Sequence, residues 1–250
     1  RLVLPLELLV EALTHEKEET CPQVLGKFHG VRIVFTEELK RHIAWECING
    51  EPVGLLLDHE FCPGMPERSA SVRLEQLLNP ESNNSWNKAR ERASMRDSEH
   101  EFLYKRFIGE YLRANQGAEK IPPGLHGTTP SLQALASCDP EIAPWRTLIS
   151  RMISAYCQDK LALDARTSEE LSEHMNCDWV TFRHFAALTL YLTINLIHNA
   201  SSDALSHKRL NQRLDMRYVA LLNPSMSFAS WDKQLSAVAS AVAHCTRVIT

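Results

Sequence analysis

The sequence has few of the features that would place the protein outside the cytoplasm. None of its seven cysteines belongs to a C-x-x-C pair, and their odd number and scattered positions do not fit a disulfide framework. Residues 1–13 show no small-residue cleavage pattern after an apolar core, so a signal peptide does not fit. We therefore expect free, buried thiols and a cytoplasmic protein.

A long hydrophobic run and a strong net charge are also missing. The most apolar stretch, 185–197, is shorter than the ~20 residues that a membrane-spanning helix needs, so we expect a buried helix there. The net charge is −4, which gives no general attraction to nucleic acid or to an anionic membrane. We expect no membrane association, and contact with a polyanion requires a local basic surface.

The chain does have enough apolar residues to bury a large core. It is 250 residues long and 44% hydrophobic, which fits one large domain or a domain with a sizeable insertion. No repeat of 20 to 50 residues is visible, so a solenoid is not indicated.

Strand-helix units are expected at both ends of the chain, with helices between them. Residues 30–35 are β-branched and glycine-bounded, and Thr36 after them is a helix cap residue, which predicts a strand and then a helix. Residues 69–200 have mainly helical periodicity. The later elements that we expect are helices near 145–163, 178–198, 203–222 and 232–244, and strands at 226–229 and 247–249.

The pattern predicts an α/β fold that is helix-rich overall. Its core, with a short parallel sheet, is formed by residues 1–68 and 201–250 and is interrupted by a large helical insertion over residues 69–200. The short strands leave an all-helical scaffold open as an alternative.

Two late acids are the most informative candidates for a functional site. Asp215 lies in a predicted helix, and Asp232 follows the predicted strand 226–229. Their separation of 17 positions accommodates a helix, a turn and a short parallel strand. Acids placed at a helix start and at the carboxyl end of a strand can converge on a cation. Each acid alone also fits a solvated helix residue or a helix N-cap.

This stretch resembles the closing part of PIN-domain nucleases, in which a strand ends in Ser/Thr-x-Asp before a helix. Here those positions are Ser230, Trp231 and Asp232. The opening residues 1–13 are similar to the PIN segment that carries a metal-site glutamate, which places Glu11 at that position. The resemblance covers about residues 1–60 and 200–250 and implies a PIN-like core.

The resemblance implies a metal-dependent ribonuclease that hydrolyses RNA phosphodiester bonds. Asp215, Asp232 and Glu11 would be ligands of Mg²⁺ or Mn²⁺, because these ions prefer carboxylate oxygens and activate a bound water. Ser230 would donate a hydrogen bond to a ligand or to the phosphate. The residues expected to contact substrate are Asn211, Arg213, Arg217 and Lys233. Implied partners are RNA and, further, an antitoxin-like inhibitor or another protein, with a homo-oligomer left open.

One feature of PIN domains is missing from residues 1–13, namely a first strand that ends in aspartate. Either that strand lies upstream of Arg1 in a longer parent, or the chain is a degenerate member. The alternative function is therefore a noncatalytic PIN-like interaction protein that lacks a complete set of acids.

Three rival clusters remain open. Residues 58–60, Asp-His-Glu, form an acid cluster at the end of a possible strand, but adjacent extended side chains cannot all face one site. His174 and Cys177 have a helical spacing that suits zinc but lack convincing partner ligands. Residues 86–113 mix basic and aromatic side chains that suit RNA, although the acids among them favour a salt-bridged surface.

Overall fold

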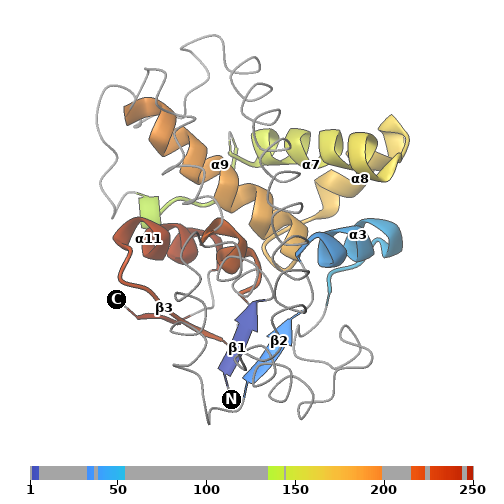
Figure 1. Cartoon of the computed structure of the whole chain (residues 1–250). Helices are drawn as coiled ribbons and strands as arrows, with labels where there is room; N and C mark the ends of the chain where they lie inside the picture. Colours follow the sequence, from blue (N-terminus) through green and yellow to red (C-terminus); the bar gives the residue numbers. More distant parts are fainter. Residues whose placement is uncertain are drawn as a thin grey trace, which may run out of the picture. The chain divides into compact units, whose positions relative to one another are not determined.

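The computed structural model describes residues 2–5, 33–36, 39–53, 135–143, 145–198, 215–222, 226–243 and 247–249 (Figure 1). The chain divides into two compact units. The first comprises Arg1–Glu38 and Leu55–Phe107, and the second comprises Leu39–Gly54 and Ile108–Thr250. The three-part division into 1–68, 69–200 and 201–250 stays a prediction.

The described part of the first unit is a pair of short strands. β1 (Leu2–Pro5) and β2 (Ile33–Thr36) run parallel, with Leu2 opposite Ile33 and Pro5 opposite Thr36. β2 confirms the strand expected from the β-branched run at 30–35. In a two-stranded ladder both strands are edge strands, where the missing N–H of Pro5 is tolerated.

The described part of the second unit is mainly helical. Its helices are α3 (Leu39–Asn49), α7 (Trp145–Leu161), α8 (Ala165–His174), α9 (Val180–His198) and α11 (Lys233–Val242), and residues 215–220 are also helical. β3 (Ser227–Ala229) and β4 (Arg247–Ile249) form a parallel pair. These elements confirm the helices expected near 145–163, 178–198 and 232–244 and the strands expected at 226–229 and 247–249.

Helix α9 lies at the centre of this unit, in contact with α3, α7 and α11. From Val180 to Tyr191 every side chain is buried except the half-buried His184. The helix contains no glycine or proline and is apolar around its circumference, as a helix packed on all sides must be. The buried helix expected over 185–197 is thereby confirmed as far as Tyr191. No helix among the described residues has the length and apolar character needed to cross a membrane.

The predicted α/β core with a PIN-like parallel sheet is wrong for the described residues. There, β1 with β2 and β3 with β4 form two separate two-stranded ladders, and most of the remaining residues are helical. The buried apolar side chains come mainly from the helices. The β-branched runs predicted strands correctly, but strands of three or four residues carry too few side chains to form a core layer.

The fully buried carboxylate of Glu46, on α3, accepts four hydrogen bonds. Its Oε1 accepts from the backbone N–H of Val53 at 3.0 Å and of Val180 at 2.9 Å. Its Oε2 accepts from the backbone N–H of Thr181 at 2.7 Å and from the Thr181 hydroxyl at 2.6 Å. Val180 and Thr181 begin α9, where N–H groups have no acceptor within the helix. Glu46 therefore caps α9 from a different helix.

Burial raises the pKa of the Glu46 carboxyl, and the hydrogen bonds from Thr181 oppose that shift. Arg183, one turn into α9, is also buried, and burial lowers its pKa while the charge of Glu46 acts in the opposite direction. The charged form of Glu46 is stabilised by its hydrogen bonds and by the positive end of the α9 dipole.

Glu46→Gln should lower the free energy of unfolding by about 2–4 kcal/mol. A glutamine amide keeps one acceptor oxygen but turns its NH₂ group toward N–H donors, so at least one buried donor loses its acceptor. Urea unfolding followed by circular dichroism measures the loss. The exposed neighbour Glu51 provides the control, since Glu51→Gln should change stability by no more than about 0.5 kcal/mol. Equal stabilities of the two variants would contradict the capping role of Glu46.

Candidate functional site

Asp232 lies three residues beyond the carboxyl end of β3, in the turn that leads into α11. β3 and β4 run parallel and α11 connects them in sequence, so this is a β-α-β arrangement. In parallel α/β units, ligands bind beyond the carboxyl ends of the strands. The sequence thus correctly predicted a strand, then an acid, then a helix at this position.

The immediate role of the Asp232 side chain is to cap α11. Its Oδ1 accepts hydrogen bonds from the backbone N–H of Gln234 at 2.8 Å and of Leu235 at 3.0 Å. Both bonds go to one oxygen, so Oδ2 is not used by the cap. Because the residue is exposed, Oδ2 remains accessible to a ligand.

Ser230 shapes the same turn. Its hydroxyl oxygen accepts the backbone N–H of Asp232 at 3.1 Å, and its carbonyl accepts the Ser236 hydroxyl at 3.4 Å. Between Ser230 and Asp232 the side chain of Trp231 is 99% exposed, and Lys233 after them is also exposed. The turn therefore presents an aromatic ring, an acid and a cation to solvent on a backbone fixed by hydrogen bonds.

The other predicted late acid, Asp215, is half-buried in the helical segment 215–220, as is Arg217. This segment is joined to α9 by Arg183, whose Nε donates to the carbonyl of Ala220 at 3.0 Å. This hydrogen bond attaches the C-terminal end of the segment 215–220 to α9, the central helix of the unit.

Several predicted site residues lie outside the described residues: Glu11, Asn211 and Arg213, together with the rival segments 58–60 and 86–113. Within the described ranges no group of three histidine, cysteine, aspartate or glutamate side chains is placed to hold a metal ion. The assignment of Asp215, Asp232 and Glu11 to one Mg²⁺ or Mn²⁺ site therefore stays a prediction.

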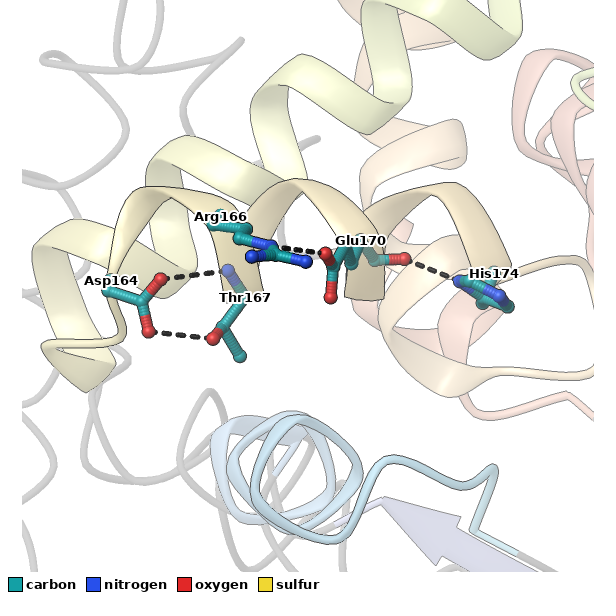
Figure 2. A network of polar contacts seen from close by, with 5 residues as sticks. All are labelled: Asp164, Arg166, Thr167, Glu170 and His174. Carbon is teal, nitrogen blue, oxygen red and sulfur yellow. Dashed lines mark hydrogen bonds and ion pairs between the residues drawn. The ribbon is translucent and has the colours of Figure 1, made fainter.

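The rival pair His174 and Cys177 has local partners of its own. Figure 2 shows the polar contacts along α8, in which Nδ1 of the exposed His174 lies 2.6 Å from the carbonyl oxygen of Glu170. At the other end Asp164 caps the helix, and its hydrogen bonds with Thr167 lower the pKa of its carboxyl. Burial is the main cause that raises the pKa of the Cys177 thiol. Its hydrogen bond with the Glu141 carboxylate raises that pKa further. A protonated thiol bound to a carboxylate is a poor metal ligand.

Two arginines bind backbone carbonyls around the start of α9. Nη1 of Arg183 donates to the carbonyl of Cys177 at 2.7 Å. Arg146 donates to the carbonyls of Met175, Ser172 and Glu173 at the end of α8, and its guanidinium lies 4.8 Å from the centre of the Phe182 ring. Arg146 satisfies carbonyls at the end of α8 and joins α7 to α8 and α9, whereas Arg183 joins α9 to the chain that precedes it.

Sequence reasoning missed Glu46 and the contact between Cys47 and Cys157. A signal for Glu46 was present, because the buried side chains of α3, including Leu39 and Ile43, follow a helical spacing that places Glu46 on the same face. The four described cysteines are free thiols, as expected: Cys47, Cys138, Cys157 and Cys177.

Comparison of the chain with protein-family models, with curated proteins and with solved structures found no match.

The capping role of Asp232 predicts a specific order of stabilities. Asp232→Ala should lower the free energy of unfolding by about 1 kcal/mol, because two N–H groups of α11 lose their acceptor. Asp232→Asn should cost only a few tenths of a kcal/mol, since asparagine caps helices about as well. Urea titrations of both variants, with Lys233→Ala as the exposed control, test this order. An alanine variant as stable as the parent would show that the cap contributes nothing.

Proposed function

We propose that the chain is a metal-dependent ribonuclease whose site lies at the turn between β3 and α11. The observation that supports this most is the position of Asp232 beyond the carboxyl end of a parallel strand, exposed and with only one carboxylate oxygen engaged in capping. The preference for RNA rests on the resemblance of residues 211–235 to the closing part of PIN nucleases.

The donor set suits a hard divalent cation, because carboxylate oxygens are the ligands that Mg²⁺ and Mn²⁺ prefer. In this proposal Asp232 supplies Oδ2, and Asp215 supplies a further oxygen. When bound, the cation would acidify a water and offset charge on the phosphate. The hydrogen bonds of the α11 cap hold the Asp232 carboxylate in one orientation. Ligand binding therefore loses less side-chain entropy.

Neighbouring polar groups have roles that follow from their positions. The Ser230 oxygen accepts the Asp232 N–H, so its own O–H remains able to donate to a phosphate oxygen. Lys233 is exposed beside Asp232 and would attract the RNA backbone. Arg217, on the helical segment 215–220, is proposed to contact the substrate, as are Asn211 and Arg213, which precede that segment in sequence.

A second candidate, a noncatalytic interaction protein, is favoured by Trp231. Tryptophan is enriched among the residues that contribute most to protein interfaces, and here it is 99% exposed on a turn fixed by the Ser230 and Asp232 hydrogen bonds. On this alternative Asp232 acts solely as a helix cap and Trp231 is the contact residue.

Asp232→Asn separates the two candidates because it removes the charge and retains the cap. The ribonuclease proposal predicts that this variant cleaves labelled RNA at least about 100-fold more slowly than the parent with Mg²⁺ or Mn²⁺, while its unfolding curve is nearly unchanged. EDTA should abolish cleavage by the parent. Asp159→Asn, which alters an exposed acid on α7, is the matched control and should cleave normally.

Equal cleavage by the parent and by Asp232→Asn would exclude Asp232 from the reaction. Absence of metal-dependent cleavage by the parent, on single-stranded and structured RNA alike, would reject the ribonuclease and leave the interaction protein.

A further inference from the structure

Two buried thiols from distant parts of the chain are in contact in the second unit. The Sγ atoms of Cys47, on α3, and Cys157, on α7, lie 3.6 Å apart, although 110 residues separate them in sequence. Cys47 is 5% exposed and Cys157 is not exposed at all. A disulfide has an S–S distance of about 2.05 Å, so the sulfur atoms need to approach by only roughly 1.5 Å.

The surroundings of the pair hold both thiols in place. Cys47 directly follows Glu46, whose carboxylate fixes α3 on the first turn of α9. Cys157 lies on the face of α7 that also carries the fully buried Ile149 and Ile153, and α7 packs against α9. Both helices are thus anchored to α9, which keeps the two sulfur atoms near each other in the folded protein.

The hydrogen bond that the thiols share makes them chemically unequal. It lowers the pKa of Cys157, against the effect of burial, and raises that of Cys47. Burial first, and then the two thiols, raise the pKa of the nearby Tyr156 to about 12. Only a thiolate attacks a disulfide, so exchange at this pair begins when one of the two thiols ionises.

We propose that Cys47 and Cys157 are a redox modification site, at which a reversible disulfide joins α3 covalently to α7. The oxidant is a low-molecular-weight disulfide such as oxidised glutathione. The thiolate of either cysteine attacks one of its sulfur atoms, forms a mixed disulfide and releases one glutathione thiolate. The thiolate of the other cysteine then attacks the protein sulfur of the mixed disulfide, forms the intramolecular bond and releases the second glutathione.

The exchange balances in atoms and electrons. Two protein thiols lose two electrons and two protons in total, and one glutathione disulfide becomes two glutathione thiols. Because the pair is buried, exchange in the folded protein requires a transient opening of α3 from α7, so the redox state changes slowly once the chain has folded. The two cysteines are 110 residues apart in sequence, so the disulfide closes a long loop, and closure of a long loop restricts the unfolded chain.

The test removes the barrier of burial by refolding the full chain from denaturant in buffers of graded reduced-to-oxidised glutathione ratio. Samples are quenched with acid, alkylated and digested, and disulfide-linked peptides are identified by mass spectrometry. We expect a linked peptide pair containing Cys47 and Cys157, two hydrogens lighter than the separate peptides, at ratios that leave Cys138 and Cys177 alkylated. The oxidised protein should melt roughly 5–15 °C higher than the reduced protein.

Two cysteine variants test whether the linked peptide and the rise in melting temperature come from this pair. Cys157→Ala should abolish both the linked peptide and the oxidant-dependent rise in melting temperature, whereas Cys138→Ala should retain both. The proposal is overturned if Cys47 and Cys157 remain alkylated in folded protein at every ratio, including oxidised glutathione alone. It is also overturned if the link forms equally well in denaturant, because the folded contact would then contribute nothing.

Discussion

The second unit depends on the placement of one carboxylate, that of Glu46, at the start of α9. Four donors converge on it: the N–H groups of Val53, Val180 and Thr181 and the Thr181 hydroxyl. An acid buried without such partners would cost several kcal/mol, whereas here each oxygen accepts two hydrogen bonds. The same contacts place α3 on α9 and fix the chain after α3 at Val53. Helices far apart in sequence thereby obtain a defined register.

Charged side chains elsewhere in this unit also join elements to one another. Arg183 joins α9 to the carbonyls of Ala220 and Cys177, and Arg146 closes the end of α8. The proposed chemistry lies elsewhere, at the exposed turn between β3 and α11. There Asp232 is at once a helix cap and an accessible acid. The Cys47 and Cys157 contact lies beside Glu46 and depends on the same docking of α3.

The sequence predicted local structure better than it predicted the assembly. Helical periodicity located α7, α9 and α11, and the run 226–229 located β3, because these signals lie within one element. The α/β core was wrong because β-branched runs predict strands but do not show which strands pair. Glu46 and the Cys47 and Cys157 pair were missed because their partners lie more than 100 residues away. For the site, sequence correctly placed Asp232 between strand and helix, whereas convergence with Asp215 and Glu11 depends on tertiary geometry that spacing does not reveal.

Native-state hydrogen exchange at the amides of Val180 and Thr181 tests the central role of Glu46 most directly. These amides begin α9 and would exchange rapidly in a helix end open to water, since they have no acceptor within the helix. We predict that both are protected to a degree similar to Phe185 in the interior of α9, and that Glu46→Ala removes this protection while that of Phe185 falls less. Rapid exchange of both amides in the parent protein would contradict the account.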